Sequence, residues 1–211
     1  MAGIVLYDFP RSSASYRVRI ALNLCGLTYE RLTVDIRGGE QDSPAFRAVN
    51  PQGLVPSLRI DGQTLTQSLA IIDCLDRRNP DVGLIPGEPA ARASALAMAQ
   101  IIMCDIHPLN NLRVLRYLET EIGADTDARD VWYARWVASG FHALERMLAG
   151  NRADVFCMGS RPGIVDLCLV PQVFNARRFN VDLKPFPLLC AKAATAEAYP
   201  AFHAAHPDQP S

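Results

Sequence analysis

Residues 4–26, IVLYDFPRSSASYRVRIALNLCG, decide the fold. The apolar run Ile4–Tyr7 predicts a short buried strand. Apolar side chains then recur at helical spacing from Val18 to Cys25, and Gly26 follows as a helix stop. A strand, a serine-rich turn and a helix are therefore expected in direct succession.

Further short strand and helix signals follow up to about residue 78. A second strand is expected at residues 29–34 and a helical turn at 44–48. Strands at 57–60 and 64–66 flank Asp61-Gly62, a two-residue hairpin signal. Ser68 is expected to cap a helix that carries Leu69, Ile71 and Leu75. The order β-α-β-(α)-β-β-α predicts an α/β domain over residues 1–80.

Residues 79–89 hold three prolines and two glycines and predict a linker. Helical periodicity dominates after it. We expect a long helix at 90–119 kinked by Pro108, a helix capped by Thr126, one from Gly163 to about 176 and one at 188–199. The second domain, residues 90–211, is therefore expected to be all-α.

Composition excludes several classes of function. The 211 residues carry a net charge of −1, which argues against a nucleic-acid partner. No apolar run approaches the roughly 20 residues of a membrane span, and charges follow the N-terminus too early for a signal peptide. The six cysteines have no metal-binding spacing, so we expect reduced thiols, no metal site and a cytoplasmic location.

The turn Pro10–Ser15 offers three hydroxyls and one arginine. These hydroxyls can simply cap the following helix. A helix N-terminus also presents N–H groups and the positive end of its dipole, so the same turn can hold an anion or a thiolate. Both interpretations remain open from this segment alone.

Two further segments have the same ambiguity. A proline that directly precedes a strand, as in Val55-Pro56, is often cis, and the turn can leave the Val55 backbone available to pair with an extended peptide. Gln67-Ser68 can bind a carboxylate at a helix start or only cap the helix.

Taken together, these segments predict a thioredoxin-like domain followed by a helical domain, and the sequence resembles a zeta-class glutathione transferase. That class includes maleylacetoacetate isomerase and the bacterial maleylpyruvate isomerases. The resemblance is carried by residues 11–22 (RSSASYRVRIAL), 50–51 (NP), 55–56 (VP), 67–72 (QSLAII), 107–111 (HPLNN), 166–173 (DLCLVPQV), 176–179 (ARRF) and 181–183 (VDL). The Val-Pro and Gln-Ser pieces occur throughout glutathione transferases, whereas the serine run and the Arg178 segment are more specific.

The resemblance implies a glutathione site in the first domain. Carried over by position, Ser12 and Ser13 hold the sulfur, and Val55 pairs with the cysteinyl backbone. The remaining implied glutathione contacts are Gln67 and Ser68 at the γ-glutamyl end, Gln41 and Gln52 at the glycine end, and His107 and Asn111 from the second domain. Arg11 and Arg178, with Arg113 as a further candidate, are implied to bind the carboxylates of a small dicarboxylate substrate.

The implied reaction is the conversion of maleylacetoacetate to fumarylacetoacetate. Reversible addition of the glutathione thiolate makes the maleyl double bond single, and rotation and thiolate loss then give the fumaryl product. Alternatives are a maleylpyruvate isomerase, a general glutathione transferase or dehalogenase, and a non-catalytic binding module of the same fold. Members of this family are usually homodimers.

The chain departs from the family pattern in two places. Ala14 replaces the cysteine of the usual Ser-Ser-Cys, which puts in doubt any chemistry that needs this thiol. Gly163 replaces the more common Thr or Ser at a helix start. Leu112 beside Arg113 slightly favours maleylacetoacetate over maleylpyruvate, whose isomerases tend to carry paired arginines there.

Overall fold

The computed structural model describes residues 3–150 and 154–209. They form two compact units. The first contains residues 3–84 and 198–209, and the second runs from residue 85 to 197.

The first unit is an α/β domain. Its elements are β1 (Ile4–Asp8), α1 (Ser13–Leu24), β2 (Tyr29–Thr33), the 3-10 turn η1 (Glu40–Asp42), α2 (Pro44–Val49), β3 (Ser57–Ile60), β4 (Gln63–Thr66), α3 (Ser68–Arg78) and α9 (Pro200–Ala204). The order confirms the predicted β-α-β-(α)-β-β-α succession. The short helix α9 adds to it from the far end of the chain.

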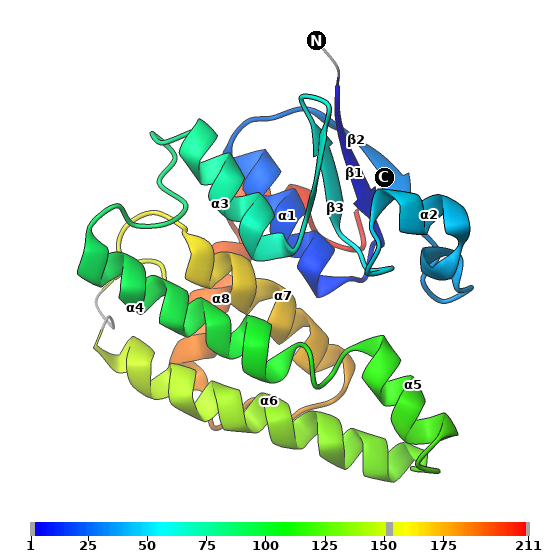
Figure 1. Cartoon of the computed structure of the whole chain (residues 1–211). Helices are drawn as coiled ribbons and strands as arrows, with labels where there is room; N and C mark the ends of the chain where they lie inside the picture. The colour runs from blue at the N-terminus through cyan, green and yellow to red at the C-terminus, as the bar shows by residue number, and fades with distance from the viewer. Residues whose placement is uncertain (1–2, 151–153, 210–211) are drawn as a thin grey trace. The chain divides into compact units, whose positions relative to one another are not determined.

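The four strands form one mixed sheet in the order β2-β1-β3-β4. β1 and β2 run parallel, with Ile4 opposite Tyr29, whereas β3 is antiparallel to both β1 and β4. Helices α1 and α3 lie on one side of this sheet and α2 on the other (Figure 1). This is the thioredoxin-like arrangement that the sequence predicted.

The turns of the first unit follow the expected residue chemistry. Gly26 ends α1 with φ of +65°, a backbone conformation that glycine adopts without a side-chain clash. Asp61 and Gly62 both have positive φ, 49° and 75°, as the two-residue hairpin between β3 and β4 requires. The Val55–Pro56 peptide bond is cis.

Charged groups lie inside the first unit beside its apolar core. Asp8, at the end of β1, is fully buried, and its carboxylate accepts from Arg19 Nη1 at 2.7 Å and from Arg31 Nε at 2.9 Å. Both oxygens of the carboxylate are therefore paired. Burial lowers the pKa of the Arg19 guanidinium, while Asp8 opposes that shift.

The second unit is all-α, as predicted. Its elements are α4 (Pro89–Gln100), the π-helical turn η2 (Ile101–Ile106), α5 (Leu112–Thr120), α6 (Thr126–Ala149), α7 (Ile164–Arg178) and α8 (Pro187–Glu197). The expected apolar stripe of α6, Val137, Phe141, Leu144 and Leu148, is buried. α7 contacts α4 and α8 and is buried along most of its length.

The prediction of one kinked helix over residues 90–119 was wrong. α4 continues into the π-helical turn, the chain then breaks at residues 107–111, and α5 starts afresh after Asn111. Pro108 lacks the N–H that a continuous helix would use. The end of the π-helical turn is tightly packed, because a Cβ built on Gly140 of α6 would lie 2.4 Å from the Ile106 side chain.

Three expected boundaries also differ. Asp125, not Thr126, caps α6, because its carboxylate accepts from the Ala128 N–H at 2.8 Å. The expected last helix ends at Glu197, and Pro200 begins the separate helix α9. Residues 198–209 pack with the first unit, whereas the expected second domain extended to residue 211, which lies outside the described residues.

The start of α7 tolerates Gly163 because a buried carboxylate takes over part of the capping. Asp166 accepts from the Gly163 N–H and from the Cys157 N–H, both at 3.0 Å. Across residues 3–150 and 154–209, no helix is long and apolar enough to cross a membrane, and no group of His, Cys, Asp and Glu has the arrangement of a metal site. All six cysteines are free thiols.

Candidate active site

The start of α1 carries the hydroxyls on which the site depends. Ser12 is the N-cap of α1, and its hydroxyl oxygen accepts from the Ser15 N–H at 3.2 Å. This bond uses an acceptor of the hydroxyl, so its proton remains available for donation. Ser13 is the first helical residue and is buried. The turn therefore caps the helix and can also stabilise an anion.

Arg11 lies directly before these serines and is half-exposed. Its Nη2 atom is 3.9 Å from a carboxylate oxygen of Asp208, in the C-terminal segment of the same unit. A guanidinium in this setting is accessible to a ligand carboxylate.

The loop before β3 presents the backbone of Val55. Asn50 is buried and braces this loop, because its side-chain amide donates to the Leu54 carbonyl at 2.7 Å and its oxygen accepts from the Gln52 N–H at 3.1 Å. Ser57 is the first residue of β3 that pairs with a neighbouring strand, so Val55 lies outside the paired part of the sheet. An extended peptide can pair with a backbone placed in this way.

The structure brings two of the predicted glutamines into contact. Gln67 Nε2 donates to Gln52 Oε1 at 2.8 Å across 15 residues of sequence. Gln67 has φ of +67°, and it occupies the cap position of α3 that was predicted for Ser68. Ser68 is the first helical residue, and its hydroxyl accepts from the buried Arg17 Nη1 at 3.3 Å. Gln67 and Ser68 therefore both lie at the start of α3, although their positions differ from the prediction by one residue.

Gln41 lies against the same loop. A Cβ built on Gly53 would be 2.9 Å from the Gln41 carbonyl oxygen, so the two backbones are in close contact. The Gln41 side chain donates to Asp42 at 2.7 Å. Its Oε1 atom is buried and accepts from none of the described residues, so the side chain has to move before this oxygen can meet a ligand.

The other candidates belong to the second unit. His107 follows η2 and is half-buried, and its N–H donates to the Ile102 carbonyl at 2.8 Å. Asn111 caps α5 through a bond from the Arg113 N–H at 3.1 Å. Arg113 itself is exposed. His107 and Asn111 are thus placed at the two ends of the break between η2 and α5.

Arg178, near the end of α7, has an ordered aromatic setting. Its guanidinium carbon is 5.7 Å from the ring centroids of both Phe174 and Phe179, and Nη1 donates to Asn175 Oδ1 at 2.9 Å. The neighbouring Arg177 instead pairs with Glu197 at 2.8 Å. The two arginines therefore have different partners: Arg178 lies beside two partly exposed aromatic rings, whereas Arg177 is held by a carboxylate.

Tyr133 of α6 connects the two candidate regions of the second unit. Its ring stacks on Phe179 with centroids 4.0 Å apart, and its carbonyl accepts from Asn110 Nδ2 at 3.3 Å. Burial raises the pKa of the Tyr133 phenol, so this group remains neutral. The loop that carries His107 and the helix end that carries Arg178 are thus held by the same residue.

Sequence reasoning missed these supporting residues. Arg17 and Asn50 lie inside the segments that carry the family resemblance, but a buried polar side chain looks the same in sequence as an exposed one. No sequence pattern predicted that Tyr133 would stack on Phe179 or that Asn175 would accept from Arg178.

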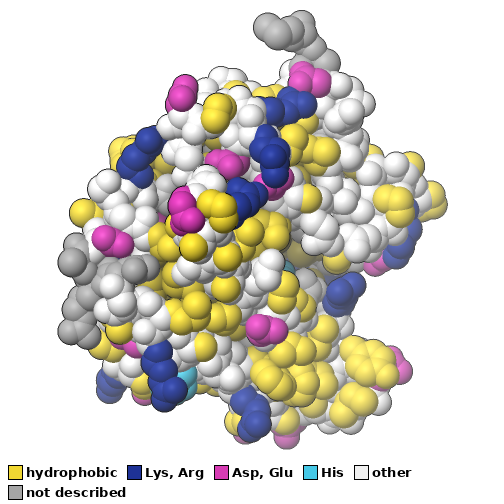
Figure 2. Space-filling model, turned by 60° about the vertical axis from the view of Figure 1, so that its left-hand side comes forward, with side chains coloured by type: hydrophobic (Ala, Val, Ile, Leu, Met, Phe, Trp, Pro, Cys, Tyr) yellow, Lys and Arg dark blue, Asp and Glu magenta, His cyan; other side chains and the backbone are white. Residues whose placement is uncertain are grey.

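Charges of both signs are mixed on one face of the molecule. On the face drawn in Figure 2, Lys and Arg side chains lie interspersed with Asp and Glu side chains among the described residues. Local pairs, such as Arg47 with Asp42 and Arg77 with Asp73, account for part of this pattern. This face therefore carries no extended basic surface among the described residues.

A thioredoxin-like unit with hydroxyls at the start of its first helix, combined with an all-α unit, defines the glutathione transferase class. Residues 6–83 match the family model described as "Glutathione S-transferase, N-terminal domain". The maleylacetoacetate isomerase of Rhizobium meliloti (strain 1021) is 48% identical over 205 residues, which are 97% of this chain and 96% of that protein.

Two solved structures are similar over the whole chain. One is the holo structure of maleyl pyruvate isomerase, a bacterial glutathione S-transferase of the zeta class, with a TM-score of 0.95, 45% identity and 98% of each chain covered. The other is maleylacetoacetate isomerase from Methylobacterium extorquens AM1 with bound malonate and GSH, with a TM-score of 0.93, 38% identity and 98% of each chain covered. The chain belongs to the zeta-class glutathione transferase family of maleylacetoacetate and maleylpyruvate isomerases.

Proposed function

We propose that this protein is a glutathione-dependent cis–trans isomerase that converts maleylacetoacetate to fumarylacetoacetate. The observation that carries the proposal is the position of Ser12 at the N-cap of α1, with its proton available for donation and Ser13 beside it. The 48% identity with a maleylacetoacetate isomerase supports the choice of substrate.

The residues of the first unit fit glutathione as a cofactor. An extended tripeptide can pair with the backbone of Val55. Gln67 and Ser68, at the start of α3, offer an amide, a hydroxyl and helix N–H groups to the γ-glutamyl carboxylate. Gln52, which accepts from Gln67, and Gln41, whose carbonyl oxygen lies against Gly53 of the same loop, serve the glycine end.

Glutathione supplies a thiolate that adds reversibly to the maleyl double bond and so permits rotation about it. The protein must keep this thiol ionised near neutral pH, where a free thiol has a pKa of about 8.5. Lowering that pKa by about two units requires about 2.7 kcal/mol. A hydroxyl bond to the charged sulfur contributes about 1.5–3 kcal/mol, and the α1 dipole about 0.3–1 kcal/mol.

The family cysteine is not needed for this step. Ala14, which replaces it, lies in the first turn of α1. The hydroxyls of Ser12 and Ser13 and the dipole of α1 are all retained. Isomerisation is therefore preserved, because the nucleophilic sulfur comes from glutathione itself.

Arginines bind the substrate carboxylates. Arg11 serves this role in the first unit and Arg178 in the second, with Arg113 as a further carboxylate ligand. A guanidinium makes bidentate bonds to a carboxylate and stabilises negative charge that develops during reaction. The related structure from Methylobacterium extorquens AM1 contains a dicarboxylate, malonate, together with GSH. His107 and Asn111 complete the glutathione contacts.

A second candidate substrate is maleylpyruvate. The similarity to maleyl pyruvate isomerase, with a TM-score of 0.95 and 45% identity, favours it directly. To distinguish the two substrates, the protein is incubated with glutathione and each maleyl keto acid in turn. The absorbance of the cis isomer is followed over time. We expect glutathione-dependent loss of the signal, with a higher kcat/KM for maleylacetoacetate. A higher kcat/KM for maleylpyruvate would reverse the assignment.

The same assay tests the remaining alternatives. Activity only towards halogenated or aryl electrophiles would identify a general transferase or dehalogenase. Inertness towards every electrophile, despite glutathione binding, would identify a binding module. We further propose that the protein acts in the cytoplasm as a homodimer, and sedimentation of the purified chain tests the dimer.

A further inference from the structure

The C-terminal segment is fixed to α1 by side chains of that helix. The Tyr16 hydroxyl donates to the Phe202 carbonyl at 3.4 Å, and Arg19 Nε donates to the Ala205 carbonyl at 2.9 Å. Phe202 is buried, and α9 packs on α1. Both acceptors lie 186 residues from their donors, so this contact is made by the fold and not by local sequence.

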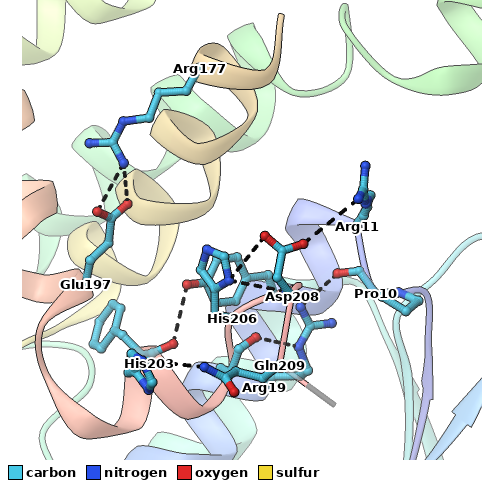
Figure 3. A network of polar contacts seen from close by, with 12 residues as sticks. Pro10, Arg11, Arg19, Arg177, Glu197, His203, His206, Asp208 and Gln209 are labelled. Carbon is cyan, nitrogen blue, oxygen red and sulfur yellow. Dashed lines mark hydrogen bonds and ion pairs between the residues drawn. The ribbon is translucent and has the colours of Figure 1, made fainter. Parts of the chain in front are cut away.

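The same arginine fixes the loop before α1. Arg19 Nη2 donates to the Pro10 carbonyl at 2.9 Å, while Nη1 pairs with the buried Asp8. One buried guanidinium therefore holds the residue before Arg11 and the C-terminal segment at once (Figure 3). The distance between Arg11 and the C-terminal segment is set by this shared anchor.

Asp208 faces Arg11 across this arrangement. A carboxylate oxygen of Asp208 is 3.9 Å from Arg11 Nη2, and the Asp208 N–H donates to His206 Nδ1 at 3.2 Å (Figure 3). The side chains of Arg11 and Asp208 are 49% and 62% exposed. The other carboxylate oxygen of Asp208 lies 3.8 Å from His206 Nδ1. The contact between Arg11 and Asp208 is long and open to solvent, so a ligand carboxylate that binds Arg11 through two bonds can replace it.

We propose that Asp208 is an internal counter-ion of Arg11 that the substrate carboxylate displaces, and that it thereby sets the affinity of the site for anionic substrates. The inference rests on the proposed function, since it takes Arg11 as a substrate ligand. Asp208 does not touch the reacting atoms. It acts through Arg11, by competition and by repulsion of an incoming anion.

The test is the variant Asp208→Asn, which retains the shape of the side chain and removes its charge. We expect KM for maleylacetoacetate to fall about two- to four-fold with kcat unchanged, which is the range for an exposed ion pair. The difference should disappear at about 1 M NaCl, where screening is nearly complete. KM for a neutral electrophile, 1-chloro-2,4-dinitrobenzene, should not change.

Asp61→Asn is the matched control. Asp61 also pairs with an arginine, Arg78, and its side chain is 66% exposed. Asn accepts the positive φ of this turn position, and the substitution removes the same charge. This variant should leave both KM values unchanged.

A double-mutant cycle with Arg11→Ala tests separately whether Arg11 binds the substrate and whether Asp208 is its counter-ion. We expect Arg11→Ala to raise KM for the maleyl substrate, and Asp208→Asn to have no further effect in that background. If Arg11→Ala raises KM but Asp208→Asn leaves it unchanged in the wild-type background, the counter-ion is refuted and the proposed function stands. If Arg11→Ala leaves KM unchanged, Arg11 is not a substrate ligand and the inference is overturned with it.

Discussion

Arg17 and Ser68 join two helices of the first unit, because Arg17 Nη1 donates to the Ser68 hydroxyl oxygen at 3.3 Å. The bond connects the interior of α1 with the first residue of α3. It places a buried positive charge behind the point where we propose that the γ-glutamyl end of glutathione binds. The bond thereby joins the helix that carries the proposed sulfur site to the helix that carries the proposed γ-glutamyl site.

Ser68→Ala removes this acceptor and the hydroxyl offered to the cofactor. We expect KM for glutathione to rise about ten-fold with little change in kcat, because a hydrogen bond to a charged group contributes about 1.5–3 kcal/mol. Initial rates at varied glutathione concentration measure it. Ser94→Ala, an exposed position on α4, is the control. A KM within two-fold of wild type would remove Ser68 from the site.

The adjacent arginines at the end of α7 provide a matched pair. Arg178 is held by Phe174, Phe179 and Asn175, whereas Arg177 pairs with Glu197. We expect Arg178→Ala to lower kcat/KM for the maleyl substrate about 10- to 100-fold, since it removes charge-assisted bonds to a carboxylate. Arg177→Ala should remain close to wild type. Equal effects of the two variants would contradict the assignment.

The buried Asp8 should be critical for stability. Asp8→Asn removes the carboxylate that pairs with the buried Arg19. It also removes the ion pair between Asp8 and Arg31. We expect the free energy of unfolding to fall by about 3–5 kcal/mol, as for other broken buried ion pairs. Urea denaturation followed by circular dichroism measures the loss.

Asp73→Asn controls for the change of charge. It breaks the exposed pair between Asp73 and Arg77 on α3, which should cost less than about 0.5 kcal/mol. If Asp8→Asn lowers the free energy of unfolding by less than about 1 kcal/mol, the ion pairs of Asp8 with Arg19 and Arg31 contribute little to folding.

Local sequence signals predicted the first unit well. The strand and helix of residues 4–26, the Asp61-Gly62 hairpin and the cis peptide before β3 all depend on nearest neighbours, and the structure confirms each. The predicted helix starts in the serine turn and at Gly163 are also confirmed, whereas the N-caps expected at Ser68 and Thr126 lie one residue earlier.

Features that depend on contacts distant in sequence were not predicted. The π-helical turn ends at Ile106, which packs closely against Gly140, 34 positions further along the chain. The return of the C-terminal segment to α1 depends on Arg19 and Tyr16, whose partners lie 186 residues away. No local pattern distinguishes these residues from ordinary helix positions.

The central claim is that the start of α1 keeps the sulfur of bound glutathione ionised. The direct measurement is the pH titration of the ultraviolet absorbance of the bound thiolate in wild type, Ser12→Ala and Ser12→Gly. Glycine preserves the helix cap to within a few tenths of a kcal/mol, so it isolates the loss of the hydroxyl. Ser68→Ala serves as a control that should change KM but not this titration.

The account predicts that both Ser12 variants raise the pKa of the bound thiol by about one to two units towards its free value of about 8.5. It also predicts that both slow isomerisation at pH 7 by about three- to 25-fold, in line with the smaller thiolate fraction. An unchanged titration together with an unchanged isomerisation rate in both variants would contradict it.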